Sequence, residues 1–382
     1  MDFRFTEEQE MMRRMARDFA DNEIVPYAQE WDAKDEFPWE CVKKMQEVGL
    51  MNIGVPAEYG GPGLDHVAQN LVVEEIARGD AGICTTMAAS TLLAADPVLI
   101  AATDEQKKWW YGRELEGVIG AFCLTEPGAG SDVAGLSTRC QKVGDEYILN
   151  GTKQFISNGG VAGQYTVFAT LDKKLGHKGI CAFMVDRDTP GISVGKKEDK
   201  LGIRSSNTTQ VIFEDVKVPA KNMLGKEGDG FKIAMKTLDI SRACVAAMAL
   251  GVAQAAFEVS VKYAMERQQF GKPIISFQAI QFMLADMAQL IEAGRLLYLE
   301  ASCKQDQGLP YTDAASLAKC FCGDVAMKVA TDAVQIYGGY GYTKEYPVEK
   351  YFRDAKIMQI FEGTAQVQRI VIANDIIRRF SK

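Results

Sequence analysis

The distribution of proline constrains this chain most, because proline interrupts helices and central strands alike. After Pro219 only Pro273, Pro310 and Pro347 occur, and the stretches between them carry apolar residues at helical spacing. We therefore predict three long helices with short connections, closed by a last amphipathic helix, as in an antiparallel bundle. The predicted helices are Phe231–Arg267, Ile280–Lys304, Ala314–Ile336 and Ala365–Phe380.

The first 224 residues of the chain divide into a helical and a strand-rich part. Thr6 and Gln9 form a capping box before an apolar helical face, and the first hundred residues are helical in pattern. The middle has strand-like runs, with Asn150-Gly151 predicted as a hairpin turn. Without long helices between them, these strands should pair antiparallel. We predict an α+β multidomain chain: an N-terminal helical domain (1–119), a central antiparallel β-barrel (120–224) and a C-terminal helical bundle (225–382).

Charge and residue usage exclude several classes of function. Asp plus Glu outnumber Lys plus Arg by 51 to 43, which argues against nucleic acid or an anionic membrane as the main partner. His66 and His177 are the only histidines, so a Ser–His–Asp triad or a multi-histidine metal site is not expected. The nine cysteines include no C-x-x-C and are expected to be buried, reduced thiols rather than a zinc or redox site.

Two features of the sequence bear on its location. Residues 1–8 show neither a signal-peptide core nor an arginine-rich transit pattern, so a cytoplasmic protein is expected. The longest uncharged segments, Ala81–Ala95 and Ala243–Phe257, fall short of the ~18 residues that a membrane span needs.

Two glycine-rich segments are candidate cofactor loops, because neither a Rossmann G-x-G-x-x-G nor a P-loop is present. Thr125-Glu-Pro-Gly-Ala-Gly-Ser-Asp132 can present consecutive backbone N–H groups to a phosphate, or it is a plain turn. Gln335-Ile-Tyr-Gly-Gly-Tyr-Gly-Tyr342 is either a close-approach loop or a helix C-cap.

Glu362 is the candidate catalytic carboxylate. It follows an apolar pair and precedes Gly363, just before the final predicted helix. Apolar neighbours raise a carboxyl pKa toward the value that a general base needs near neutral pH. The alternative is a first-turn glutamate that interacts with the helix dipole.

Taken together, these motifs resemble the acyl-CoA dehydrogenase flavoprotein family over essentially the whole chain. Any one of the matching segments is weak, but their order and spacing are specific. They are 124–132, Asn150-Gly151 with 155–157, 213–219, 238–242, 266–272, 333–339, 346–350, 353–356 and 361–364.

The resemblance implies a fold and a cofactor. The family has an N-terminal helical domain, a central β-barrel and a four-helix bundle, and it binds FAD between barrel and bundle, with a neighbouring subunit completing the site, usually in a homotetramer. Residues implied to contact FAD are Phe122, Leu124, Thr125, Gly130, Ser131, Phe155 and Ser157 on the barrel side, Arg267, Phe270 and Gln278 toward the partner subunit's FAD, Gln335, Gly338 and Gly339 opposite, and Thr364 and Gln366 above the cofactor.

The resemblance also implies the reaction. Glu362 takes the α-proton of an acyl-CoA thioester while the β-hydride goes to flavin N5, and electrons pass on to an electron-transferring flavoprotein. The thioester oxygen is stabilised in an oxyanion-hole arrangement that includes the backbone N–H of Glu362. Ser131, Asp239, Arg242 and Gly363 are implied to contact the substrate. Some relatives carry the base near Leu238–Arg242, where this chain has Ile240-Ser241, so Glu362 is the matching base.

Asp96 departs from the family pattern, because relatives commonly have an uncharged residue near this end of the pocket. A carboxylate in apolar surroundings is costly unless it is paired, protonated or functional. Asp96 is therefore either a cap beside Pro97 or a second acid/base or polarity filter for an alicyclic, unsaturated or otherwise unusual acyl group.

Two further functions stay open. One is a 2-enoyl-CoA reductase, which would use the same residues in reverse. The other is a catalytically silent assembly protein, against which the intact Glu362-Gly363-Thr364 speaks. Acyl chains of short to medium length are expected.

Overall fold

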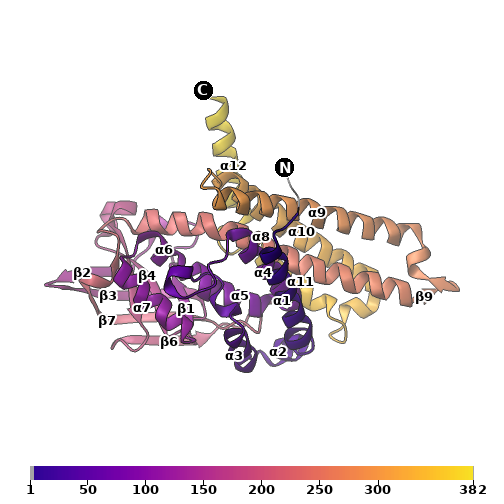
Figure 1. Cartoon of the computed structure of the whole chain (residues 1–382), viewed down its shortest axis with the longest axis horizontal. Helices are drawn as coiled ribbons and strands as arrows, with labels where there is room; N and C mark the ends of the chain where they lie inside the picture. The colour runs from indigo at the N-terminus through magenta and orange to yellow at the C-terminus, as the bar shows by residue number, and fades with distance from the viewer. Residues whose placement is uncertain (1–3, 382) are drawn as a thin grey trace.

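The computed structural model describes residues 4–381, which form helical regions at both ends of the chain and a β-sheet between them (Figure 1). The predicted capping box begins the first helix, since Thr6 Oγ1 accepts from Gln9 N and Gln9 Oε1 accepts from Thr6 N. The N-terminal helices are α1 (Glu7–Phe19), α2 (Ala28–Lys34), α3 (Trp39–Glu47), α4 (His66–Gly79), α5 (Ala81–Ala88), α6 (Asp96–Ala101) and α7 (Asp104–Leu115), with short 3₁₀ and π segments between some of them.

The middle of the chain forms one eight-stranded sheet in the order β6-β7-β3-β2-β4-β5-β8, with β1 paired to β4. Most neighbours are antiparallel, as expected from the short connections, but β1 and one residue of β2 pair parallel with β4. The strands are β1 (Gly120–Cys123), β2 (Arg139–Val143), β3 (Glu146–Ser157), β4 (Gln164–Thr170), β5 (Ile180–Asp186), β6 (Ile192–Lys197), β7 (Thr208–Pro219) and β8 (Met223–Leu224).

The predicted hairpin at Asn150-Gly151 is wrong. β3 runs through both residues, and the register against β7 shifts there, which is the mark of a β-bulge. Gly151 has φ of 154°, and a Cβ on it would lie 2.5 Å from Thr138 Oγ1. Glycine is therefore required at this position by close packing within the sheet, whereas the turn between β2 and β3 falls at Gly144.

The C-terminal region is the predicted set of long helices. They begin and end within a few residues of the predicted bounds, and one further helix, α11, lies between the third long helix and the last. The elements are α8 (Gly230–Glu266), α9 (Gln278–Asp306), α10 (Thr312–Tyr337), α11 (Val348–Ile357) and α12 (Ala365–Phe380), with the small hairpin β9 (Gln268–Gln269) and β10 (Lys272–Pro273) between α8 and α9. Figure 1 shows the sheet and this hairpin at opposite ends of the long axis.

Two helical segments of the described chain are long and apolar enough to span a membrane, Ala81–Ala101 and Gly230–Glu266. The sequence prediction had counted only uncharged stretches and therefore judged them too short. Of their most apolar windows, 83% and 72% respectively are buried inside the fold. Their apolar faces pack against other parts of this chain.

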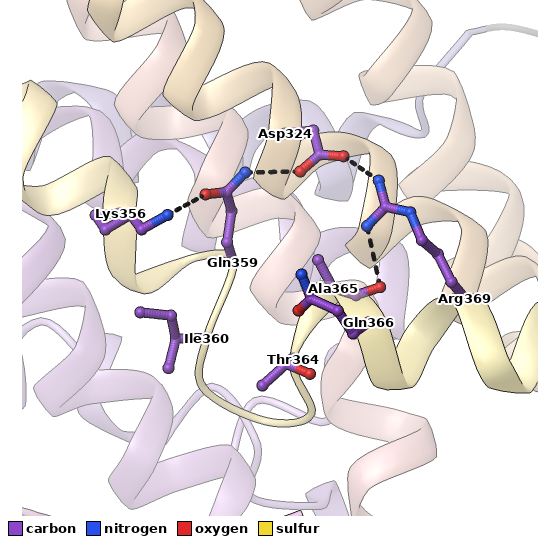
Figure 2. A pocket seen from close by; sticks show the side chains of 8 residues that line it. All are labelled: Asp324, Lys356, Gln359, Ile360, Thr364, Ala365, Gln366 and Arg369. Atoms are coloured by element: carbon purple, nitrogen blue, oxygen red, sulfur yellow. Dashed lines mark hydrogen bonds and ion pairs between the residues drawn. The ribbon is translucent and has the colours of Figure 1, made fainter.

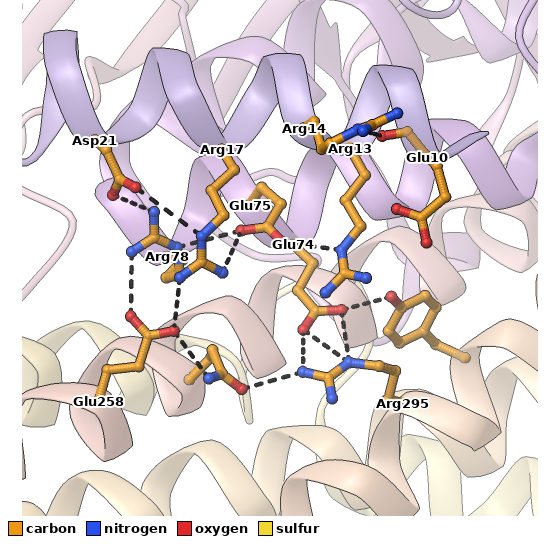
Figure 3. Close-up of polar contacts among 12 residues, drawn as sticks. Glu10, Arg13, Arg14, Arg17, Asp21, Glu74, Glu75, Arg78, Glu258 and Arg295 are labelled. Atoms are coloured by element: carbon orange, nitrogen blue, oxygen red, sulfur yellow. Dashed lines mark hydrogen bonds and ion pairs between the residues drawn. The ribbon is translucent and has the colours of Figure 1, made fainter. Parts of the chain in front are cut away.

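A network of ion pairs joins the N-terminal helices to the bundle (Figure 3). Glu74 of α4 accepts from Arg295 of α9 at 2.6 Å and from the Tyr298 hydroxyl at 2.5 Å. Arg78, also on α4, pairs with Asp21 and with Glu258 of α8. Because most of these groups are buried or half-buried, the network fixes how the two helical regions pack together.

Candidate active site

Glu362 lies in the loop between α11 and α12, outside any helix. α12 begins at Ala365 with Thr364 as its N-cap, so the first-turn interpretation of Glu362 is wrong. The backbone of Glu362 is left-handed, with φ of 52°, which is uncommon for a residue other than glycine and is often found at functional sites.

The loop is held from two helices. Lys319 of α10 donates to the carbonyl oxygen of Gly363 at 2.6 Å, and Gln368 of α12 donates to the same oxygen at 3.1 Å. Gly363 has φ of 91°, and a Cβ on it would lie 2.6 Å from Gln368 Nε2. Neither Lys319 nor Gln368 was predicted to contact this loop, because a polar residue on a helix carries no signal of the loop it will contact.

The Glu362 carboxyl group is set up to exchange a proton near neutral pH. Its Oε2 atom is buried and has no hydrogen-bond partner in the described chain. Burial raises the pKa of Glu362 to about 7, against the opposing effects of the Ser241 hydroxyl and the cations Lys319 and Arg242.

Arg242 of α8 lies close enough to Glu362 for their charges to interact. Its Nη1 donates to Asp239 Oδ1 at 2.5 Å and to Ser316 Oγ at 3.2 Å, while its Nε is buried without a partner. Burial lowers the pKa of this guanidinium, with Asp239 acting in the opposite direction. Asp239 and Arg242, which were predicted to contact the substrate, thus form an ion pair with each other. The Nε donor of Arg242 is left without a partner in the described chain.

Asp96 is the second carboxyl group of the site. It is 6% exposed, lies in the first turn of α6 and has an unpartnered Oδ2. Ala95 is the N-cap residue of α6, so the interpretation of Asp96 as a cap is wrong. Burial, followed by the charges of Glu362 and Glu114, raises the pKa of Asp96 well above its usual range.

The segment Thr125–Asp132 is a tight turn held against β3. Glu126 and Ala129 exchange two backbone hydrogen bonds, and Gln154 N donates to Thr125 O at 2.8 Å. A buried ion pair, Lys153 Nζ to Glu126 Oε1 at 2.8 Å, supports the turn from below. Burial opposes ionisation of Glu126, but Lys153 and hydrogen bonds from Thr138 and Ser137 outweigh it and lower its pKa to about 2.

The outer side of this turn is open. A Cβ added at Gly128 or Gly130 would meet nothing within 4 Å. Phe155 on β3 is 62% exposed and has a left-handed backbone, φ of 57°. An exposed aromatic ring beside an open glycine turn is a surface on which a flat, phosphate-bearing cofactor can lie.

The predicted FAD residues form separate groups. Those of the sheet region lie on β1, β3 and the turn after β1: Phe122, Leu124, Thr125, Gly130, Ser131, Phe155 and Ser157. A second group lies at the far end of the bundle, where Arg267 stacks over Tyr340 at 5.3 Å: Arg267, Phe270, Gln278, Gln335, Gly338 and Gly339. Gly338 is also the C-cap of α10, so the capping interpretation of this glycine is correct. Since the groups lie at opposite ends of the long axis, one chain does not bring them together (Figure 1).

Thr364 and Gln366 belong to a third group, which lines a pocket of about 420 Å³ next to the Glu362 loop (Figure 2). Asp324 connects two other residues of the pocket lining, since it accepts hydrogen bonds from Gln359 at 2.7 Å and from Arg369 at 2.6 Å. This pocket is lined by polar and charged side chains together with Ile360 and Ala365.

Profiles of acyl-CoA dehydrogenase domains match nearly all of this architecture: the N-terminal domain at residues 6–117, the middle domain at 121–216 and the C-terminal domain at 228–377. A short-chain specific acyl-CoA dehydrogenase of Clostridium acetobutylicum is 48% identical over 99% of this chain and 100% of its own length.

The chain belongs to the acyl-CoA dehydrogenase family.

Solved structures of the acyl-CoA dehydrogenase fold agree with this assignment. The butyryl-CoA dehydrogenase of Megasphaera elsdenii superposes with a TM-score of 0.97 at 47% identity, covering 99% of this chain and 100% of that one. A chain from a study of the electron transferring flavoprotein of Acidaminococcus fermentans gives 0.97 at 50% identity, with 99% and 100% covered. An acyl-CoA dehydrogenase of Bacillus anthracis complexed with FAD gives 0.91 at 33% identity, covering 99% of this chain and 68% of that one.

This acyl-CoA dehydrogenase has no metal centre among its described residues, since no group of three His, Cys, Asp or Glu side chains there could hold an ion. Eight of the nine cysteines are buried, as expected from the sequence, whereas Cys303 is exposed.

Proposed function

We propose that this FAD-dependent oxidoreductase converts a short-chain acyl-CoA to the 2-enoyl-CoA, with Glu362 as the base that removes the α-proton. The observation that carries the proposal is the buried, unpartnered Oε2 of Glu362 on a loop fixed by Lys319 and Gln368. The short-chain specific relative and the butyryl-CoA dehydrogenase, each nearly half identical over the full chain, support the substrate class.

The environment of Glu362 suits this step. The α-proton of a thioester is weakly acidic, so a carboxylate with an ordinary pKa is too weak a base. Burial makes the carboxylate more basic, while the nearby cations keep part of it ionised at neutral pH. Closure of the pocket around the acyl chain removes water and strengthens the hydrogen bonds to the thioester oxygen, one of which we assign to the backbone N–H of Glu362.

The chain has the residues to hold FAD. The open turn at Gly128–Gly130 and the exposed ring of Phe155 fit the flavin and its phosphates, and Thr364 and Gln366 lie beside the polar pocket of Figure 2. When bound, FAD supplies the acceptor for the β-hydride of the substrate.

The remaining cofactor contacts are assigned to a second copy of the chain. Phe270 is 92% exposed in the turn between β9 and β10. This hairpin lies at the opposite end of the molecule from β3, the strand that carries Phe155 (Figure 1). α12 projects away from the bundle and exposes Ile370, Ile377 and Phe380. Both features support an oligomer, which we propose to be the homotetramer usual in the family, with each tip completing a neighbour's FAD site.

Ser131, Asp239 and Arg242 are proposed to bind the coenzyme A arm of the substrate, while the backbone of Gly363 lines its thioester end. Ser131 is exposed on the glycine turn, and the buried unpartnered Nε of Arg242 offers a donor. We propose that an electron transferring flavoprotein accepts the electrons of the reduced FAD. The similar chain from the study of the electron transferring flavoprotein of Acidaminococcus fermentans supports this acceptor.

A second candidate function follows from Asp96. A buried carboxyl group that faces the catalytic base, with an unpartnered oxygen, is unusual for a pocket that takes only plain alkyl chains. It favours an acyl group that carries a polar, unsaturated or alicyclic feature. Replacement of Asp96 with Leu, which makes this position apolar, would then improve turnover of butyryl-CoA relative to the natural substrate.

The proposal is tested by anaerobic titration of the purified holoenzyme with butyryl-, hexanoyl-, isobutyryl-, glutaryl- and cyclohexanecarbonyl-CoA. One of these substrates should abolish the oxidised flavin absorbance of the wild type and of Glu105→Gln, but not that of Glu362→Gln. This result would support the dehydrogenase and identify its substrate class. Glu105 is an exposed glutamate on α7 and serves as the matched control. No reduction by any of them, with enoyl-CoA reoxidising the chemically reduced enzyme, would favour the reductase instead.

A further inference from the structure

The wall behind Asp96 contains an unusual set of buried polar atoms. Five of them have no hydrogen-bond partner in the described chain: Asp96 Oδ2, both carboxyl oxygens of Glu114, Trp110 Nε1 and Tyr111 Oη. All four residues are buried, and Glu114 is only 2% exposed. The last three lie on α7, which packs against α6 and carries Glu114 in its final turn.

No cation neutralises these two carboxyl groups. Among the described residues neither Asp96 nor Glu114 has an ion pair, and the nearby cations are engaged elsewhere. Arg113 pairs with Asp186 at 2.6 Å, Arg242 with Asp239, and Lys319 donates to Gly363.

The groups that face the pair are acids or neutral. Asp96 interacts with Glu362 and Glu114, while Tyr111, Tyr311 and Cys244 respond to the charge of Asp96. Glu114 is faced by the Thr91 hydroxyl and the Trp110 indole.

Within the described chain Asp96 and Glu114 have no cation of their own, so these two carboxyl groups and the neighbouring Glu362 cannot all be ionised. Burial raises the pKa of Glu362 to about 7 and that of Glu114 to about 8, and that of Asp96 lies well above its usual range. Of the three, Glu362 has the cations Lys319 and Arg242 beside it, and its charge disfavours ionisation of Asp96. Burial, an unpartnered Oδ2 and the lack of an ion pair therefore favour the neutral form of Asp96 beside an ionised Glu362.

We propose that Asp96 acts in its neutral form, as a hydrogen-bond donor to an uncharged acceptor oxygen on the acyl group, and that Glu114 is a positioning residue for it. This inference rests on the proposed function and makes it more specific. The preferred acyl-CoA carries a ketone or similar uncharged oxygen near Asp96. An acyl group with a terminal carboxylate is disfavoured, because no cation near Asp96 in the described chain is free to pair with that carboxylate.

Glu114 acts through Asp96 in a pH-dependent way. While Glu114 is protonated, the Asp96 hydroxyl is free to point toward the substrate. Once Glu114 loses its proton, its carboxylate becomes the better acceptor, and the Asp96 hydroxyl turns toward it. The preference for an acceptor oxygen should then disappear as the pH rises past about 8.

The test uses matched ligands in the Glu362→Gln holoenzyme, so that binding is measured without turnover. 4-Oxopentanoyl-CoA and 4-methylpentanoyl-CoA differ only by a carbonyl oxygen or a methyl group on the same carbon, and 5-oxohexanoyl-CoA with 5-methylhexanoyl-CoA moves the oxygen one carbon further. One ketone of the two pairs is expected to bind about fivefold tighter than its methyl partner at pH 6.5, as one net hydrogen bond allows.

Four added substitutions separate the roles. Asp96→Asn should keep the preference, because its amide also donates, whereas Asp96→Leu should lose it. Glu114→Gln should keep the preference up to pH 9, where the parent has lost it, and Glu105→Gln should behave as the parent. A role for Glu114 in packing alone would not move this pH dependence.

No ketone preference in either pair, or a preference lost in Asp96→Asn, overturns the inference, since in the latter case a donor at this position would not account for the preference. Flavin reduction by butyryl-CoA in the enzyme that retains Glu362 tests the proposed function separately. Intact reduction without a ketone preference therefore removes this inference alone.

Discussion

Lys319 on α10 donates to the carbonyl oxygen of Gly363 at 2.6 Å, one residue after the candidate base Glu362. The lysine is buried, and burial lowers its pKa to about 8, partly offset by the Glu362 charge. One side chain thus fixes the catalytic loop and supplies positive charge to its carboxylate.

Replacement of Lys319 by Met should raise the pKa of Glu362, since a cation that favours its charged form is removed. We expect the acid limb of the rate of flavin reduction to move up by about one pH unit, which lowers the rate about tenfold at pH 6. Stopped-flow reduction across pH 5.5–9 measures this shift. Lys328→Met, an exposed position on the same helix, should leave the profile unchanged.

The wild-type enzyme should itself show this acid limb. Glu362 must be deprotonated to accept the α-proton, and burial raises its pKa to about 7. The rate of reduction should therefore increase as the pH rises through 7 and then level off. A second-order rate constant of reduction, measured at low substrate, that is flat between pH 5.5 and 8 would contradict Glu362 as a titrating base in the free enzyme.

Glu114 should make the enzyme less stable as the pH rises. Burial raises its pKa from 4.5 to about 8, so between these values the folded state holds a proton that the unfolded state has lost. The destabilising effect of Glu114 is absent below pH ~4.5. Between pH ~4.5 and about 8 it lowers the free energy of unfolding by up to about 1.4 kcal/mol per pH unit. In thermal unfolding, the melting temperature of Glu114→Gln relative to the wild type should be higher at pH 8 than at pH 5. The relative melting temperature of Glu105→Gln should not change between the two pH values.

The network of Figure 3 predicts a large loss of stability on removal of Glu74. Glu74→Gln leaves the half-buried Arg295 with the exposed Glu292 as its one remaining carboxylate in the described chain, which should cost about 3 kcal/mol in the free energy of unfolding. Tyr298→Phe removes one hydrogen bond from the same carboxylate and should cost about 1 kcal/mol. Denaturant unfolding of both variants, with the exposed pair variant Lys34→Ala as control, measures the difference.

Much of the fold follows from the sequence alone. The long helices α8, α9 and α10 were predictable because prolines bound them and because their apolar residues repeat at helical spacing. Asn150-Gly151 was misleading because the same dipeptide occurs in hairpin turns and in bulges. Here the close contact of Gly151 with Thr138, which lies just before β2, is compatible with the bulge. α11 is short and amphipathic, and the prediction passed over it.

The candidate site, like the fold, was predictable from the sequence only in part. Glu362 was predictable because its local motif is distinctive. The environment of Glu362 was not, since Lys319 and Ser241 reach it from two helices far away in the sequence. Asp96 was noticed as an unusual carboxylate, but Glu114 was not, because an acidic residue near the end of a helix is ordinary until the fold buries it.

The most direct test of the central claim is a single-turnover measurement of flavin reduction by butyryl-CoA under anaerobic conditions. The wild type and Glu105→Gln should reduce at the same rate, and α-deuterated substrate should slow both, since the α-proton moves in the step. Glu362→Gln, with FAD bound in normal amount, should be slower by at least about a thousandfold, because its amide cannot accept the proton. Reduction by Glu362→Gln within tenfold of the wild-type rate would contradict the assignment of Glu362 as the base.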